Sequence, residues 1–143
     1  MTKKTIHTSK QRTTYEVKTK DLGAVEMRIA AEKQELLRLR DELKAKGVKY
    51  CVGAYVDIHG VPKGKLVPLE GLTDAVATGA GFAGPSIWGT GLPRMGARSE
   101  YFGRVVPESL RPMPLLPGVA HAVCDGFAGG QPLETCSRQL LQR

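Results

Sequence analysis

The segment YCVGAYVDIHGVPKGKLVP, residues 50–68, constrains the fold of this chain more than any other. Its first half alternates side chains with a period of two, the spacing of a strand with one buried face. Residues 58–60, Ile-His-Gly, have the chemistry of a turn in which Gly60 can adopt a positive φ, and residues 61–68 then run back. The segment therefore predicts a β-hairpin.

Asp57 lies at the mouth of this predicted hairpin. A carboxylate at a strand end is held by rigid backbone while its head reaches solvent or a partner, so Asp57 is a candidate site residue. The alternative is that Asp57 only accepts hydrogen bonds from amides of the turn, as aspartate often does. Position in the hairpin leaves both interpretations open.

Two helices flank the hairpin in the sequence pattern. Residues 22–46 are rich in Ala, Glu, Leu, Lys and Arg, with apolar residues every three, four or seven positions, which predicts an amphipathic helix ended by Gly47. The apolar spacing is not a sustained heptad, so packing on a sheet is favoured over a coiled coil. Residues 69–78 predict a shorter helix, ended by Gly79.

The regular pattern stops in residues 79–103, which contain seven glycines, two prolines and the only tryptophan. Such a long connection in a compact domain is usually functional or disordered. Phe82, Ile87 and Trp88 indicate that this one packs against a partner, and we expect them to be partly exposed without it. GAGFAG is not a phosphate-binding loop because it lacks the Gly-Lys-Ser/Thr ending.

The last third of the chain predicts further extended structure. Prolines restrict residues 111–116 to an edge strand or an extended segment. Residues 119–124 have the pattern of a strand, and Asp125-Gly126 is a turn signal. His121 in this strand is interpreted as a partnered histidine of the sheet, because the three histidines of the chain do not cluster at ligand spacing.

Charge and cysteine usage exclude several classes of protein. Of the net charge of +7, +5 lies in residues 1–20, a tail rich in Thr and Lys that we predict to be disordered. The tail lacks aromatic residues interleaved for base stacking, which argues against nucleic-acid binding. Three cysteines without a C-x-x-C pair argue against zinc, and Cys51 and Cys124 are expected to be buried in a reducing compartment. Without an apolar run of about 20 residues or a secretory signal, we expect no membrane partner and a location in the cytoplasm.

The string VDIHGVPKGK, followed by GAGFAGPSIWG, resembles the N-terminal domain of the glutamine synthetase family, in the branch that includes γ-glutamylmethylamide synthetases. The likeness continues through PMPLLPGVAHAVCDG and CSRQLLQR, and it covers roughly residues 36–143. It implies an α+β, β-grasp-like domain over residues 21–143. We expect a small mixed sheet, a packed N-terminal helix and a long Gly-rich loop.

The resemblance also implies a site. It assigns to Asp57 the binding of ammonium or methylammonium and help in its deprotonation, tasks that suit a carboxylate. Many relatives carry an aspartate where this sequence reads Phe82-Ala83-Gly84, so the role of that acid does not transfer. The family loop near the same site matches the following residues: Gly81, Phe82, Ala83, Gly84, Pro85, Ser86, Ile87 and Trp88.

In the family, a catalytic barrel of the neighbouring subunit of a homo-oligomer holds ATP, glutamate and Mg or Mn. The sequence stops at Arg143, before the position of that barrel. We therefore expect a fragment of an ATP-dependent amide ligase that binds no cofactor or metal and is inactive by itself. The alternative is a stand-alone β-grasp module with a binding or regulatory role.

Overall fold

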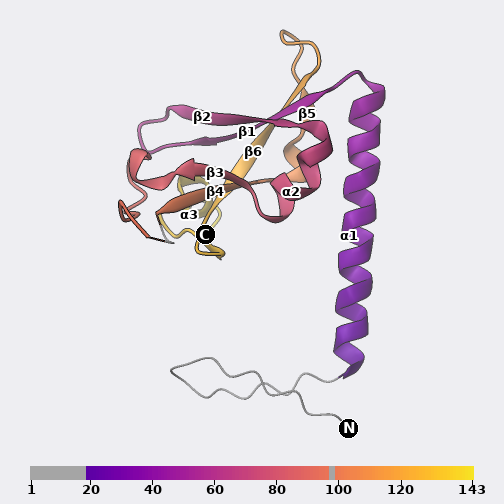
Figure 1. Cartoon of the computed structure of the whole chain (residues 1–143), viewed down its shortest axis with the longest axis horizontal. Helices are drawn as coiled ribbons and strands as arrows, with labels where there is room; N and C mark the ends of the chain where they lie inside the picture. The colour runs from indigo at the N-terminus through magenta and orange to yellow at the C-terminus, as the bar shows by residue number, and fades with distance from the viewer. Residues whose placement is uncertain (1–18, 97–98) are drawn as a thin grey trace. The chain divides into compact units, whose positions relative to one another are not determined.

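The computed structural model describes residues 19–96 and 99–143, and it is an α+β fold (Figure 1). By its internal contacts the chain divides into residues 1–35 and 36–143, and the sheet lies in the second part. Most of the tail predicted to be disordered, residues 1–18, lies outside the described residues. Among the described residues, no helix has the length and hydropathy required to cross a membrane.

Helix α1, Thr19–Ala45, confirms the first predicted helix and begins three residues earlier than expected. In its last turns, Leu36 and Leu43 are buried in the core and Leu39 packs against them. The helix stops where Gly47 adopts a φ of 79° and its amide bonds to the carbonyl of Lys44, the usual chemistry of a glycine stop. Because these three leucines of the apolar stripe meet the core, the last turns of the helix pack as predicted.

The predicted hairpin is present as β1, Tyr50–Val56, and β2, Pro62–Pro68, paired in antiparallel register. Gly60 has a φ of 76°, the left-handed conformation expected in the turn. The face of β1 that carries Cys51 and Tyr55 is buried, whereas Val56 on the opposite face is 51% exposed. The core therefore lies against the face of β1 that carries Cys51 and Tyr55.

Three more strands complete a mixed sheet in the order β2-β1-β6-β4-β3 (Figure 1). They are β3, Ala80–Ala83, β4, Glu100–Val105, and β6, Val119–Ala128. β6 lies parallel to β1, whereas β4 is antiparallel to both of its neighbours. Two short strands, β5 at Arg111–Pro112 and β7 at Gln131–Pro132, also pair with β6. The α+β class is confirmed, while the β-grasp assignment stays a prediction.

Two sequence predictions about loops were wrong. The ends of the 79–103 stretch are the strands β3 and β4, which pair with each other, because the ladder between them and the burial of Tyr101 and Val105 stabilise extended structure despite the glycines around it. The Asp125-Gly126 signal does not end the strand, since β6 continues to Ala128. A Cβ on Gly126 would overlap the Tyr101 ring, so this glycine provides space for the ring instead of a turn.

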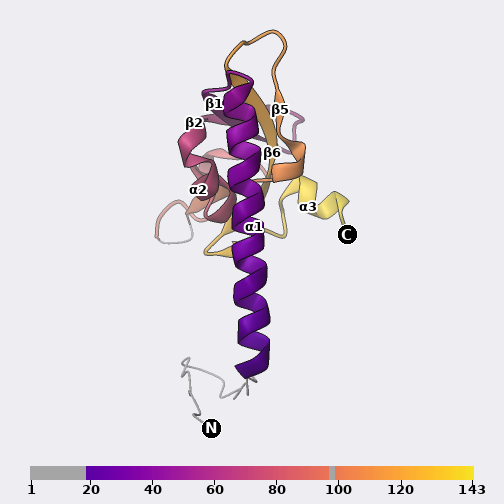
Figure 2. The same cartoon turned by 90° about the vertical axis from the view of Figure 1, so that its right-hand side faces the viewer.

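Short helices cover the remaining edges. The predicted second helix is a 3-10 turn, η1 at Leu69–Gly71, followed by α2, Leu72–Ala77, with Leu69 and Leu72 buried. Two other 3-10 turns are η2, Gly84–Ser86, and η3, Pro107–Ser109. Helix α3, Ser137–Leu141, contacts β6 (Figure 2).

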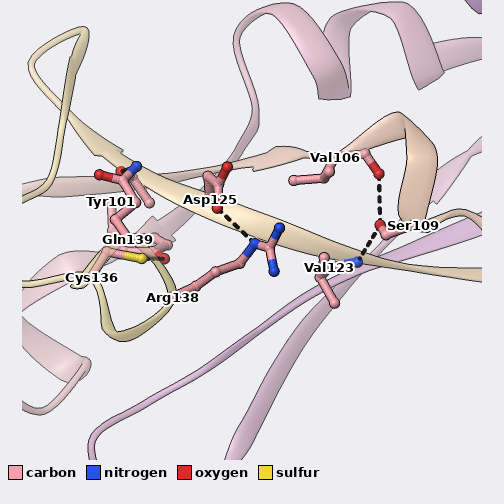
Figure 3. A network of polar contacts seen from close by, with 9 residues as sticks. Tyr101, Val106, Ser109, Val123, Asp125, Cys136, Arg138 and Gln139 are labelled. Atoms are coloured by element: carbon pink, nitrogen blue, oxygen red, sulfur yellow. Dashed lines mark hydrogen bonds and ion pairs between the residues drawn. The ribbon is translucent and has the colours of Figure 1, made fainter. Parts of the chain in front are cut away.

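Polar contacts hold α3 and η3 to β6 (Figure 3). Arg138 donates to the Asp125 carboxylate at 2.9 Å, and the Gln139 amide donates to the Gly126 carbonyl at 2.9 Å. On the other side, the Ser109 hydroxyl donates to the Val106 carbonyl and accepts from the Val123 amide. β6 is therefore fixed to its neighbours by side chains as well as by the sheet ladder.

The core contains all three cysteines, which are free and buried. Cys51 and Cys124 are each 1% exposed, as predicted for small apolar residues. Burial raises the pKa of the Cys51 thiol to about 11. The pKa of Cys124 is raised to about 12, mainly by burial and then by the charges of Cys51, Asp125 and Cys136. Both thiols are therefore protonated at neutral pH and serve as packing groups.

Candidate functional site

The hairpin turn fixes one oxygen of Asp57. The Oδ1 atom accepts the amide of His59 at 2.9 Å and the amide of Val61 at 3.0 Å. The backbone of the turn is closed as well, because the Gly60 amide donates to the Asp57 carbonyl at 3.0 Å. The turn role that the sequence left open for Asp57 is therefore real, and it leaves Oδ2 for another partner.

That partner is a cation. The Lys63 Nζ atom lies 3.6 Å from Asp57 Oδ2, and the side chain of Lys63 is 40% exposed while that of Asp57 is 2% exposed. Of the two expectations for the head of Asp57, solvent or a partner, the structure shows the partner. The reason is the register of the hairpin, which places Lys63 diagonally across from Asp57 on the same face, within reach of a long side chain.

These contacts keep Asp57 ionised. The Val61 amide is the largest cause that lowers the pKa of Asp57 below its ordinary value, and the His59 amide and the positive charge of Lys63 add to it. Burial by itself would raise the pKa of Asp57, but its effect is smaller than the combined lowering by these contacts. At neutral pH the site is therefore a nearly covered carboxylate with one fixed oxygen.

The predicted loop, residues 81–88, contacts the β1–β2 hairpin near its first residue and near its last. At the first end, Lys65 of β2 donates to the Gly81 carbonyl at 3.0 Å, and the Phe82 ring packs edge-on against Tyr55 with centroids 5.0 Å apart. At the other end, the Trp88 and His59 rings lie 5.9 Å apart. The structure therefore brings the predicted loop to the Asp57 turn.

A glycine makes the second contact close. A Cβ on Gly89 would overlap the side chain of Ile58, so the loop backbone approaches the turn where only glycine fits. This approach brings the loop against the two residues that follow Asp57, Ile58 and His59.

The other predicted loop residues divide between the core and the surface. Ile87 is 7% exposed and belongs to the core, so the expectation that it would be exposed was wrong, whereas Trp88 is 70% exposed as predicted. Gly84 is buried, and its amide donates to the Ser99 carbonyl at 3.1 Å. Phe82 is half-buried against the core.

Thr90 holds this loop in shape, a role that the sequence analysis missed. Its buried hydroxyl lies 3.0 Å from the carbonyl oxygens of both Gly84 and Ile87, to which it donates. Its own carbonyl accepts the hydroxyl of Thr135 at 2.9 Å. A lone threonine in a glycine-rich stretch was the signal that could have indicated a buried cross-link.

An open hollow of about 720 Å³ lies beside the first part of the loop. Glu100 and Arg94 give it one acidic and one basic side chain. Its lining comprises Gly81, Phe82, Ala83, Pro85, Ser86, Arg94, Ser99 and Glu100. Five of the eight residues predicted to form the substrate loop therefore border a concave surface.

The described residues do not form a metal site. No three of their His, Cys, Asp or Glu side chains gather closely enough to hold a metal ion. His121 is half-buried in β6, opposite Val52 on one side and Arg111 on the other, which agrees with its interpretation as a sheet residue. Lys63 is the functional candidate that sequence reasoning did not connect to Asp57, although the hairpin register would have indicated it.

Comparison with known proteins relates this region to ligases. The chain is 41% identical over 102 residues to the glutamate–methylamine ligase of Methyloversatilis universalis, a match that covers 71% of this chain and 23% of that protein. It is 32% identical over 100 residues to the glutamine synthetase of Rhizobium meliloti, covering 70% and 22%. This region is homologous to the glutamine synthetase family.

Solved structures agree with this homology to glutamine synthetase-family ligases. A structure titled "GmaS/ADP complex-Conformation 1" matches with a TM-score of 0.64 and 31% identity, over 73% of this chain and 24% of that one. "Apo GmaS without ligand" matches with a TM-score of 0.63 and 30% identity, over 69% and 23%. No protein-family model matches the sequence. The chain thus spans less than a quarter of the length of these relatives.

Proposed function

We propose that this chain supplies Asp57 and residues 81–88 to the amine site of a glutamine synthetase-family ligase. The reaction is the ATP-dependent joining of glutamate to methylamine or ammonia. The observation that carries the proposal is the state of Asp57, which is ionised, fixed through Oδ1 and in contact with an ammonium group through Oδ2. The homology to a glutamate–methylamine ligase supports the choice of substrate class.

A carboxylate in this state suits a cationic acceptor. An ammonium or methylammonium ion has N–H groups that can donate to Oδ2, and a charge-assisted bond of this kind is stronger than a neutral one. The nitrogen must lose a proton before it can attack an activated carboxyl group. Because its pKa is lowered, Asp57 is a weak base, so its main contribution is to bind and orient the cation.

The rest of the reaction requires another domain. ATP chemistry in such ligases needs a divalent metal held by convergent carboxylates or histidines, and the described residues do not fit such a site. We assign ATP, the metal and glutamate to a catalytic barrel in a neighbouring subunit of a homo-oligomer. Exposed Trp88 and the hollow beside residues 81–86 offer surfaces for that barrel. A location in the cytoplasm is part of the proposal, supported by the three free, buried cysteines.

The proposal is tested by joining the full chain to the catalytic barrel of a relative and substituting Asp57. We expect Asp57→Asn to lower the turnover of amide formation by about 10²-fold, the scale of losing the positioning of a reacting group. The matched control is Asp74→Asn, because Asp74 is an exposed aspartate of α2 outside the site. Assembly of each chimera is checked by its mass in solution.

Two outcomes would contradict the proposal, and a third would favour its alternative. Unchanged turnover of an assembled Asp57→Asn chimera would leave Asp57 with its turn role alone. Amide formation by the isolated chain with ATP, magnesium, glutamate and methylamine would show that no separate barrel is needed. Failure of the chain to assemble with any family barrel would favour the binding or regulatory module.

A further inference from the structure

The cation on Asp57 has the chemistry of the proposed acceptor. The end of the Lys63 side chain is a CH₂–NH₃⁺ group, and methylammonium is CH₃–NH₃⁺. In the described part of the chain, Lys63 is the one cationic group within ion-pair distance of Oδ2. The fixed oxygen, Oδ1, is already used by two amides. An incoming alkylammonium ion would therefore need the position that Lys63 holds.

We propose that Lys63 is an intramolecular stand-in for the acceptor amine, which covers Asp57 when the acceptor is absent and gives up its place when the acceptor binds. This inference rests on the proposed amine-binding role of Asp57. It goes further by naming the residue that competes with the substrate.

The geometry allows this exchange. The Nζ–Oδ2 separation of 3.6 Å is longer than the roughly 2.7–2.9 Å of a tight charge-assisted hydrogen bond. The lysine is 40% exposed, so its ammonium group can be hydrated when it leaves. A small ammonium ion carries no chain anchored to β2, so it can approach Oδ2 to full hydrogen-bonding distance where Lys63 does not.

The second lysine on the same face provides a natural comparison. Lys65 lies on β2 two residues beyond Lys63, and its Nζ donates to the Gly81 carbonyl instead of contacting Asp57. Both are long, partly exposed cations of one strand, but the structure places only Lys63 on the carboxylate. Removing Lys65 therefore changes the charge near the site without opening Oδ2.

The test is an NMR titration of the full chain with methylammonium chloride, followed at the Asp57 carboxyl carbon and the amides of His59 and Val61. Tetramethylammonium chloride at equal ionic strength is the control ion, because it has the same charge and no N–H group. We expect methylammonium alone to shift these signals. In Lys63→Met the half-saturating concentration should fall about two- to sixfold, the range for loss of a competing, partly exposed ion pair.

Three variants make the result specific. Lys63→Arg keeps a cation on Asp57 and should bind methylammonium nearly as weakly as the wild type. Lys65→Met should resemble the wild type, since it leaves the contact of Lys63 in place. Asp57→Asn should lose the response in any background, because the amide has no charge to attract the ion.

The outcomes separate this inference from the proposed function. Equal half-saturation in wild type and Lys63→Met would overturn the stand-in role while leaving amine binding by Asp57 intact. Equal shifts with tetramethylammonium would show charge screening alone and would overturn it too. No response to methylammonium in folded Lys63→Met would contradict the amine-binding role itself, and the stand-in with it.

Discussion

The hairpin of β1 and β2 and the loop between β3 and β4 border the same candidate site, but they are held in place by different kinds of interaction. In the hairpin, the contacts that fix Asp57 come from residues within six positions along the chain. In the loop, Thr90 makes short-range bonds to Gly84 and Ile87, but other fixing contacts come from distant segments, including Thr135 and the core around Ile87. The hairpin is a local structure, and the loop depends on the rest of the domain.

This difference explains why one region was predicted and the other was not. Local contacts leave a pattern in consecutive residues, such as alternation, a turn triplet and an aspartate before it. Long-range contacts leave none, because the partner of a loop residue lies tens of positions away. The following substitutions should weaken the loop through its packing and the hairpin through its backbone.

The largest effect is expected from the loop residue that reaches the core. Ile87→Ala should lower the free energy of unfolding by about 2–5 kcal/mol, because it leaves a cavity where a buried side chain was. The neighbouring Trp88→Ala should cost about 0.5 kcal/mol or less, since Trp88 is mostly exposed. Urea denaturation measures both. Similar losses at the two positions would mean that the loop is held through Trp88 and the hairpin instead of through the core.

The next effect should come from the backbone of the hairpin turn. Gly60→Ala should cost about 1–2 kcal/mol, the strain of a left-handed conformation in a residue with a Cβ. A Cβ at this position meets no atom within 4 Å, so the cost is conformational and not steric. Gly60→Asn should be milder, because asparagine adopts this conformation more readily. If thermal unfolding showed Ala to be as stable as Gly, the turn would not need its positive φ.

A smaller effect is expected at the hydroxyl that holds the loop. Thr90→Val should cost about 1 kcal/mol, the usual net worth of a hydrogen bond. The same change at Thr78, on the exposed end of α2, should cost less than about 0.5 kcal/mol. Hydrogen exchange should accelerate in residues 84–92 of Thr90→Val and leave the hairpin amides unchanged. Faster exchange in both regions would show that the loop and hairpin open together.

The smallest effect concerns the charge of Asp57. Its pKa should lie below the ordinary value of 3.8, with the Val61 amide as the main cause. Lys63→Met should raise the pKa of Asp57 part of the way back, since the two amides remain. A lowered pKa in the folded state means that ionised Asp57 stabilises the fold above its ordinary pKa, and that this stabilisation is lost as the pH falls through the folded pKa. Carbon-13 NMR of the carboxyl group measures the midpoint of each titration. An unchanged midpoint in Lys63→Met would show that the ion pair does not lower the pKa of Asp57.

Much of the fold was predictable because its elements are recognisable by themselves. The helix α1 was indicated by its apolar stripe, the hairpin by its alternation, and α2 by its spacing of leucines. β3 and β4 were not, because β3 is only four residues long, β4 follows a stretch rich in glycine and proline, and the two strands are stabilised by pairing. The length of β6 was also missed, because Gly126 serves the Tyr101 ring and not a turn.

The sequence by itself determined that Asp57 lies at a hairpin turn. The residue order of the hairpin and of the following Gly-rich stretch also indicated the family and the loop near Asp57. Only the tertiary structure decided which face of β1 is buried, that Lys63 covers Asp57, and that Trp88 and Ile87 point to opposite environments. The physical reason is that a period of two specifies two faces without specifying which one meets the core. That choice depends on the volume of distant side chains, here the rings of Phe82 and Tyr101 packed over Tyr55.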